Sequence, residues 1–217
     1  MHYPPTHVGL IPDGMRRWAH SNSSTLEISY SLGASKVAEF VGALAAEGTR
    51  EVTIFGLSSA NLQRPPNELT PLYRAALELL GKTLPEILST VDSEFRLIGR
   101  RSLVPAACRE AAERLELTHD SGRFRVNVLA AYDPARELQD AFARSQELGI
   151  PFEEALEVGD VDVVVRTSPE KLLSGFLPYQ SRNALLHFSE IPLNDLSVDD
   201  FLLIVKSLSS IEPLRGR

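Results

Sequence analysis

Strand-length apolar runs alternate with segments of helical periodicity six times along this chain. The expected strands span 8–11, 51–58, 95–99, 124–131, 161–166 and 185–188. The expected helices span 32–47, 67–89, 105–117, 134–148 and a last segment that begins at 197. Such alternation is typical of an α/β protein with a largely parallel sheet. At 217 residues we expect a single domain, spanning 1–217.

The run 161–166 is almost pure valine, which is typical of a strand that is covered on both faces. Prolines at 71 and 85 interrupt the helical segment 67–89. Pro134 suits the first turn of a helix, and Ser197 begins a pattern that resembles a capping box. In open parallel sheets ligands bind beyond the carboxyl ends of the strands. We therefore expect the functional site at that edge of the sheet.

The composition excludes several classes of protein. The formal net charge is −7, whereas a nucleic-acid surface needs clustered Lys and Arg. The single cysteine, Cys108, rules out an internal disulfide and a zinc site built on cysteines, and its alanine-rich surroundings indicate ordinary helix packing. No stretch approaches the ~20 apolar residues of a membrane span, and residues 1–6 lack the apolar core of a signal peptide. We expect a soluble, cytoplasmic protein that binds no nucleic acid.

The segment 11–19, Ile-Pro-Asp-Gly-Met-Arg-Arg-Trp-Ala, indicates the end of a strand, a tight turn and the start of a helix. Asp13 and Gly14 fall at the turn, where unpaired backbone N–H groups favour a phosphate. Arg16 and Arg17 add cations. Because Asp13 alone would repel a phosphate, it indicates a bound cation or an acid–base role. The alternative is that Asp13 caps the helix and that both arginines are solvated.

Two further polar segments follow expected strands. Arg166 stands at a strand end and suits bidentate contact with a phosphate; the alternative is a pair with a nearby acid. Ser58 and Asn61 suit a proton relay or a polar head group, with Arg64 as an anion contact; the alternative is ordinary turn chemistry. Residues 20–25 are expected to form a mobile loop, for which a lid is one use.

Several familiar motifs are absent from the sequence. It contains no GxGxxG, Walker, HExxH or GxSxG pattern, and its five histidines show no spacing for metal ligands. Phosphate-type turns without a nucleotide motif favour a small diphosphate as the substrate.

Four ordered segments match one set of family motifs over almost the whole chain. Residues 7–19 are similar to H-V-x-x-I-x-D-G-N-G-R-W-A, and 55–65 to a Phe-Ser-Ser/Thr-Glu-Asn-Trp-x-Arg-Pro segment. Residues 126–132 match a strand that ends in Asn-Tyr-Gly-Gly-Arg, and 162–176 are similar to D-L-x-I-R-T-G-G-E-x-R-x-S-N-F. Together they resemble the cis-prenyltransferase family, the family of undecaprenyl diphosphate synthase.

The resemblance implies a six-stranded, mostly parallel sheet surrounded by helices, in a chain that forms a homodimer. It implies a prenyltransferase that acts on allylic diphosphates, with an apolar tunnel beside 32–47 and 67–89. Asp13 would be the central catalytic acid and the ligand of Mg²⁺, the expected cofactor. Further site candidates are Ser58 and Asn61 in deprotonation, and Gly14, Met15, Arg16, Arg17, Trp18, Tyr30, Arg64, Arg166, Lys171 and Ser174 in substrate binding.

The chain departs from the family pattern at several binding positions. The arginine and histidine that hold the allylic diphosphate fall at Leu26 and Tyr30, and a second arginine of the R-T-G-G-E-x-R segment falls at Leu172. The glutamate that helps to bind Mg²⁺ falls at Leu185, which leaves the dependence on magnesium open. A charged hydrogen bond is worth about 1.5–3 kcal/mol, so these losses argue against the ordinary reaction unless other contacts compensate.

The run Asp-Gly-Met-Arg-Arg-Trp at 13–18, together with Tyr30, resembles an irregular branch of the family, that of the cyclolavandulyl and isosesquilavandulyl diphosphate synthases. These enzymes couple two allylic diphosphates head-to-middle. The main hypothesis is that dimethylallyl and geranyl diphosphate combine into a branched lavandulyl-type diphosphate, with release of diphosphate. Three alternatives stay open: an ordinary head-to-tail synthase of short product length, an inactive scaffold subunit, and a phosphate-binding module without transferase chemistry.

Overall fold

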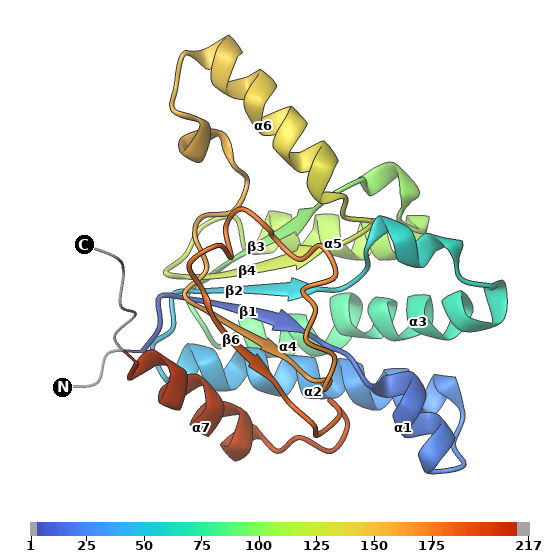
Figure 1. Ribbon diagram of the computed structural model, residues 1–217. Helices are drawn as coiled ribbons and strands as arrows, with labels where there is room; N and C mark the ends of the chain where they lie inside the picture. Colours follow the sequence, from blue (N-terminus) through green and yellow to red (C-terminus); the bar gives the residue numbers. More distant parts are fainter. Residues whose placement is uncertain (1–3, 212–217) are drawn as a thin grey trace.

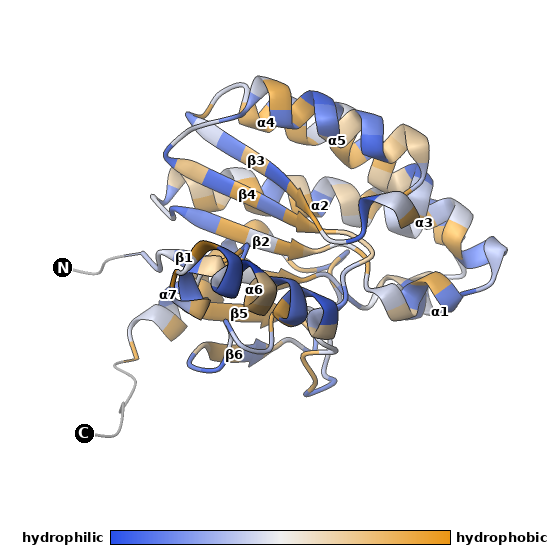
Figure 2. Ribbon diagram, turned by 90° about the horizontal axis from the view of Figure 1, so that it is seen from above, coloured by the Kyte–Doolittle hydropathy of each residue, from blue (hydrophilic) through white to orange (hydrophobic). Residues whose placement is uncertain are grey.

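The computed structural model describes residues 4–211 and contains a six-stranded sheet whose strands all run parallel. The strands are β1 (His7–Ile11), β2 (Glu51–Phe55), β3 (Ser93–Ile98), β4 (Phe124–Leu129), β5 (Val163–Arg166) and β6 (Leu185–Phe188). Their order is β3-β4-β2-β1-β5-β6, which puts β2 and β1 in the centre (Figure 1, Figure 2). The expected α/β fold with a parallel sheet is confirmed.

Seven α-helices lie between and after the strands in the described part of the chain. They are α1 (Met15–Ser21), α2 (Leu26–Ala46), α3 (Pro66–Glu78), α4 (Leu84–Leu88), α5 (Ala106–Thr118), α6 (Pro134–Leu148) and α7 (Val198–Ser209). Short 3₁₀ turns occupy Ser59–Gln63, Arg101–Leu103 and Phe152–Ala155, and a π-helical turn, Leu79–Thr83, joins α3 to α4. Between residues 4 and 211, no helix has the length and apolar character needed to cross a membrane.

The two faces of the sheet are covered differently. Helices α2, α4, α5 and α7 pack on one face and form the larger apolar core with the side chains of the central strands. In this layer Phe40 of α2 stacks on Phe201 of α7, with ring centroids 4.1 Å apart. The irregular segments on either side of β5 cover the other face, where Phe176 packs against Phe55 at 5.7 Å. Helix α6 projects from the body of the molecule (Figure 1).

Several expected boundaries need correction. The helix expected at 32–47 is α2, which already begins at Leu26 because the Thr25 side chain accepts a hydrogen bond from the Ile28 N–H and caps it. The loop expected at 20–25 therefore shrinks to the four residues between α1 and α2 and is too short for a lid. The segment 67–89 is divided by the π-helical turn, with Pro71 inside α3 and Pro85 in the first turn of α4.

The strand register brings distant loops together at the carboxyl edge of the sheet. Ile11 of β1 pairs with Arg166 of β5, so the residues just beyond β1 lie beside the end of β5. On the other side of β1, a bridge between Ser58 and Tyr132 extends the pairing of β2 with β4. The loops that follow β1, β2 and β5 therefore meet at one place, as expected for a ligand site in this kind of sheet.

Candidate active site

Asp13 and Arg166 form the centre of a polar site at the ends of β1 and β5. Arg166 donates two hydrogen bonds to Asp13 Oδ2, from Nη2 at 2.7 Å and from Nε at 3.2 Å. Arg166 is only 5% exposed, and its Nη1 also donates to the hydroxyl of Ser174 at 3.0 Å and to the carbonyl of Leu172. The alternative given for Arg166 in the sequence analysis, a pair with a nearby acid, is therefore present in the structure.

The carboxyl group of Asp13 is ionised at neutral pH. Burial alone would raise the pKa of Asp13, but hydrogen bonds from Arg166 and from the Gly14 N–H, with the charges of Arg166 and Arg17, outweigh it and leave the pKa below its ordinary value. The other oxygen, Oδ1, accepts the 2.6 Å hydrogen bond from Gly14. Because Gly14 itself occupies the N-cap of α1, the alternative that Asp13 caps this helix is wrong.

The turn at Asp13 and Gly14 is fixed by contacts from two other segments. Gly14 has a φ of 94°, and a Cβ atom there would lie 2.8 Å from Pro192 Cβ, so the turn requires glycine. Thr167 Oγ1 accepts a 2.8 Å hydrogen bond from the Asp13 N–H and donates a 2.9 Å hydrogen bond to the Asp13 carbonyl. Thr167 was not singled out from the sequence; its place directly after Arg166 was the available signal.

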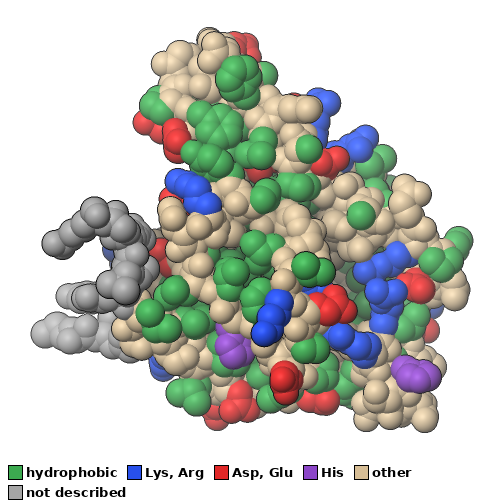
Figure 3. Space-filling model, in the orientation of Figure 1, with side chains coloured by type: hydrophobic (Ala, Val, Ile, Leu, Met, Phe, Trp, Pro, Cys, Tyr) green, Lys and Arg blue, Asp and Glu red, His purple; other side chains and the backbone are tan. Residues whose placement is uncertain are grey.

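A polar cavity of about 260 Å³ opens in front of Asp13. Three arginines line it, Arg16, Arg64 and Arg166, against one acid, Asp13. Glu68 pairs with Arg16 at 3.1 Å and Glu170 pairs with Arg166 at 3.0 Å, so the cavity offers guanidinium donors for a polyanion such as diphosphate rather than a net positive charge. Figure 3 shows basic and acidic side chains gathered over the region between α1 and α3. Of the expected site residues, the cavity brings together Asp13, Met15, Arg16, Tyr30, Ser58, Asn61, Arg64, Arg166 and Ser174.

Ser58 and Asn61 hold each other in a capping box at the turn Ser59–Gln63. Ser58 Oγ accepts a hydrogen bond from the Asn61 N–H at 3.2 Å, and Asn61 Oδ1 accepts one from the Ser58 N–H at 3.3 Å. The turn chemistry that the sequence offered as an alternative is therefore present. The capping box does not use the Ser58 hydroxyl hydrogen or the Asn61 amide hydrogens, which remain as donors on two residues that line the cavity. Turn chemistry and contact with a substrate are therefore compatible.

Tyr30 lies where the polar cavity meets a second, apolar cavity. The residue is 3% exposed, and its hydroxyl lies close to the guanidinium of Arg64 but makes no well-formed hydrogen bond among residues 4–211. Burial raises the pKa of Tyr30, and the charges of Arg64 and Arg16 only partly oppose this, so the hydroxyl is neutral and can donate. A buried polar group without a partner costs about 1–3 kcal/mol, which a bound ligand can recover.

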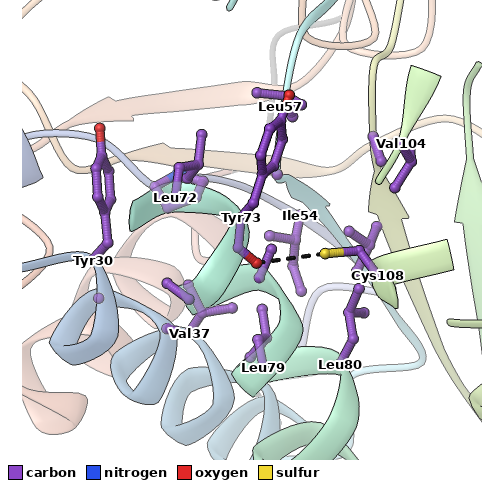
Figure 4. Close-up of a pocket in the computed structure, with 18 of the residues that line it drawn as sticks. Tyr30, Val37, Ile54, Leu57, Leu72, Tyr73, Leu79, Leu80, Val104 and Cys108 are labelled. Atoms are coloured by element: carbon purple, nitrogen blue, oxygen red, sulfur yellow. Dashed lines mark hydrogen bonds between the residues drawn. The ribbon is translucent and has the colours of Figure 1, made fainter. Parts of the chain in front are cut away.

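The apolar cavity is narrow, about 100 Å³, and lies between α2, α3 and the sheet (Figure 4). This is where the resemblance places an apolar tunnel. Helix α2 contributes Gly33, Ala34 and Val37 to its wall. Five residues line both cavities: Pro12, Met15, Tyr30, Gly56 and Leu72. A cavity lined by arginines therefore adjoins an apolar one.

Cys108 lines the apolar cavity on the side opposite Tyr30 in Figure 4. Its thiol is buried, donates to the backbone carbonyl of Tyr73 at 3.5 Å, and has its pKa raised by burial. A thiol with a raised pKa is a poor nucleophile. The expected packing role fits this environment.

Four expected site residues are not among those that line the polar cavity. Gly14 shapes the turn through its backbone. Arg17 donates a hydrogen bond into the loop after β5, and Trp18 donates from Nε1 to Asp195 Oδ1 at 2.7 Å. Lys171 is exposed. These four positions therefore lie outside the lining of the cavity.

Glu170 was not singled out from the sequence. Its carboxylate lies 3.0 Å from Arg166 Nη2 and 3.5 Å from Arg17 Nη1. The glutamate of the R-T-G-G-E-x-R segment falls at this position, and that match was the available signal.

The acids of the site fit a magnesium ion only in part. Residues 4–211 contain no group of three or more His, Cys, Asp or Glu side chains that could hold a metal. Leu185 pairs with Val163 at the start of β6 and has no ligating atom in its side chain. Magnesium is commonly held by one or two carboxylates together with substrate phosphates. Asp13 therefore fits this ion in the presence of a bound diphosphate.

Comparisons with known proteins agree on one family and one fold. A family profile described as "Putative undecaprenyl diphosphate synthase" matches residues 11–213. The (2Z,6E)-farnesyl diphosphate synthase of Mycolicibacterium smegmatis is 34% identical over 209 residues, which cover 86% of this chain and 78% of that protein.

Two solved structures share the fold. Lavandulyl diphosphate synthase from Lavandula x intermedia, in complex with dimethylallyl diphosphate, superposes with a TM-score of 0.89 and 24% identity over 100% of both chains. A "probable undecaprenyl diphosphate synthase" from Campylobacter jejuni superposes with a TM-score of 0.82 and 23% identity, covering 98% of this chain and 99% of that one. At these identities the likeness shows the fold alone.

Proposed function

The chain belongs to the cis-prenyltransferase family of undecaprenyl diphosphate synthase, and we propose that this isoprenyl diphosphate synthase joins two short isoprenoid diphosphates. One observation carries the proposal: the arginine-lined cavity at Asp13 adjoins the small apolar cavity, with five residues shared between them. An isoprenoid diphosphate has the same two parts, an anionic head and an apolar tail. The small volume of the apolar cavity, about 100 Å³, supports a short tail.

We assign Arg16, Arg64 and Arg166 to the diphosphate groups. Negative charge grows on the departing diphosphate as the allylic carbon–oxygen bond breaks, and guanidinium groups already in place stabilise it without reorganising. Ser174 has a left-handed backbone, with a φ of 52°, and its hydroxyl accepts from Arg166 at 3.0 Å. Such a conformation costs about 1–3 kcal/mol outside glycine, which supports a functional reason for it.

The condensation also releases a proton, for which the departing diphosphate is the natural base. Ser58 and Asn61 are the groups we assign to holding or passing this proton. Both line the polar cavity, and their mutual hydrogen bonds fix their positions relative to each other.

Asp13 is the residue we assign to Mg²⁺, together with oxygens of the bound diphosphate. When bound, the ion supplies positive charge that neutralises the leaving diphosphate. In the absence of substrate Arg166 already neutralises Asp13. The proposal therefore predicts that magnesium binds well only together with a diphosphate.

The comparisons favour the head-to-tail form of the reaction, in which isopentenyl diphosphate is the acceptor. The relative from Mycolicibacterium smegmatis, at 34% identity, carries the name (2Z,6E)-farnesyl diphosphate synthase. We therefore place short-chain head-to-tail synthesis first. The sequence favours head-to-middle coupling as the main hypothesis, with head-to-tail synthesis as an alternative; the name of this relative reverses that order.

Head-to-middle coupling of two allylic diphosphates is the second candidate. A specific observation favours it: Leu172 and Leu185 stand where the family pattern has an arginine and a glutamate. Leu172 is 61% exposed, so no apolar packing accounts for a leucine there. An inactive scaffold role has less support, because Asp13 lines a cavity with three arginines.

A product assay separates these candidates. The purified chain receives dimethylallyl diphosphate alone, with geranyl diphosphate, or with isopentenyl diphosphate, and in a further reaction geranyl diphosphate with isopentenyl diphosphate, each with and without Mg²⁺. Products are identified by mass spectrometry after phosphatase treatment. Unbranched products formed only with isopentenyl diphosphate support head-to-tail synthesis. Branched products formed without it support head-to-middle coupling, and no product in any reaction contradicts both.

We also propose that two copies of the chain associate through α6. This helix projects from the body, and its Phe142 is 60% exposed (Figure 1). The exposed positions on the same face of the helix are uncharged, namely Ala135, Gln139 and Gln146. An aromatic side chain within an uncharged surface suits the centre of a protein interface.

A further inference from the structure

Glu170 connects two arginines of the candidate active site. Its Oε2 accepts a 3.0 Å hydrogen bond from Arg166 Nη2, and its Oε1 accepts a long, 3.5 Å hydrogen bond from Arg17 Nη1. A single carboxylate therefore spans two guanidinium groups. The Glu170 carboxylate is an anion held between two guanidinium groups, an environment that would also suit one phosphate group of a diphosphate.

Glu170 and its two partners differ in freedom to move. The side chains of Glu170 and Arg17 are 54% and 48% exposed, whereas that of Arg166 is 6% exposed. Exposed side chains change rotamer within nanoseconds, so Glu170 can leave when another anion arrives. Its backbone is held separately, because the Glu170 N–H donates to Ser168 Oγ at 3.3 Å.

Arg166 stays in position without Glu170. It keeps two hydrogen bonds to Asp13, and a third to the Ser174 hydroxyl at 3.0 Å. Arg17 likewise keeps its 2.6 Å hydrogen bond to Ser168 Oγ. The contacts of Glu170 thus add negative charge to both arginines but are not needed to orient them.

We propose that Glu170 is a resident counter-anion that competes with diphosphate for Arg17 and Arg166 and so limits the affinity of the site for substrate and for released diphosphate. The proposal rests on the assignment of Arg166 to diphosphate binding and extends that role to Arg17, which shares Glu170 with it. A substrate diphosphate must displace the Glu170 carboxylate to bind. When the diphosphate product leaves, the Glu170 carboxylate takes its place again. Glu170 therefore favours release of the diphosphate product.

Calorimetric titration of the full chain with inorganic diphosphate, in EDTA, tests this role. Glu170→Gln keeps the shape of the side chain and removes its charge. We expect binding about fivefold tighter than in the wild type, the effect of one partly exposed ion pair. Glu113→Gln is the matched control, because Glu113 is 50% exposed and pairs with Arg109 on the distant helix α5. Its affinity for diphosphate should not change.

Each other result overturns the proposal. Weaker binding by Glu170→Gln would mean that the carboxylate orients the arginines, and equal binding would mean that it exerts no competition. Absence of binding by the wild type would contradict the diphosphate site itself. Turnover provides a second readout: inorganic diphosphate should inhibit Glu170→Gln at a lower concentration than it inhibits the wild type. Thermal unfolding of each variant checks that it is folded.

Discussion

Oδ2 of Asp13 lies 2.7 Å from Nη2 of Arg166, although 153 residues separate the two along the chain. The pair joins the ends of β1 and β5 and places the one acid of the polar cavity against its most buried arginine. If Asp13 has the assigned role, Asp13→Asn should lower kcat by about 10²-fold or more. Steady-state turnover with each substrate pair measures this. Full activity of the variant would contradict the assignment.

The lowered pKa of Asp13 predicts a pH dependence of stability. In the folded chain Asp13 stays ionised below its ordinary pKa of 3.8, so its pairing stabilises the fold above that pH, and this contribution is lost as the pH falls through the lowered pKa. The difference in the free energy of unfolding between wild type and Asp13→Asn should be constant from about pH 8 to about pH 5 and shrink below about pH 4. Denaturant titrations at each pH measure it; a difference that grows on acidification would contradict the prediction.

Tyr30→Phe should separate stability from function. The variant removes a buried hydroxyl that makes no well-formed hydrogen bond, so the free energy of unfolding should not fall below that of the wild type. Catalytic efficiency should fall if the hydroxyl donates to substrate. Tyr179→Phe is the control, because its hydroxyl bonds to Glu153 outside both cavities. Unchanged efficiency of Tyr30→Phe would remove Tyr30 from the substrate-binding residues.

Ala34→Leu should restrict the length of the substrate tail. Ala34 lines the apolar cavity and is 8% exposed, so a larger side chain fills space that a tail would occupy. We expect turnover with geranyl diphosphate to fall about tenfold relative to dimethylallyl diphosphate, roughly the cost of one or two methylene groups. Ala46→Leu, at the exposed end of α2, should leave the ratio unchanged. An unchanged ratio in Ala34→Leu would place the tail elsewhere.

Leu172→Arg tests whether position 172 limits the use of isopentenyl diphosphate. The side chain is exposed, so arginine should be tolerated. One added charged hydrogen bond to a diphosphate should lower the KM for isopentenyl diphosphate about tenfold. Leu172→Gln controls for the loss of the apolar side chain. An unchanged KM would show that this position does not face the second diphosphate.

Phe142→Asp should convert a dimer into a monomer. The substitution puts a charge at the centre of the proposed α6 surface, where a buried unpaired charge strongly disfavours association. Light scattering after gel filtration measures the mass, and Leu117→Asp, at an 81% exposed position on α5, is the control. A wild-type chain that is already monomeric would contradict the proposal.

Local sequence signals were enough for most of the fold. The valine run predicted a strand covered on both faces, and β5 is such a strand. Strand β6 and helix α6 occupy the residues expected for them. The start of α2 was missed because residues 20–25 are rich in Ser and Asn, which are read as loop. Their last residue, Thr25, is instead the cap of the helix.

The candidate site was predictable as a set of residues but not as a set of contacts. Strand ends carry Asp13, Ser58 and Arg166, and a parallel sheet must bring strand ends together. Which charge faces which depends on rotamers and on the loop after β5, so the sequence offered a pair of Arg166 with a nearby acid as an alternative but did not identify Asp13 and Glu170 as its partners. The lack of a well-formed hydrogen bond at the Tyr30 hydroxyl is likewise a property of packing.

The central position of β1 has a consequence for synthesis of the chain. Its partner β5 is among the last strands to be made, and until residues 163–166 are available one side of β1 has unpaired backbone groups. An exposed strand edge of this kind invites pairing with other chains. A chain interrupted before β5 would therefore combine two defects, an open sheet edge and an Asp13 carboxylate without its arginine. The pair of Asp13 and Arg166 therefore cannot form before β5 has been synthesised.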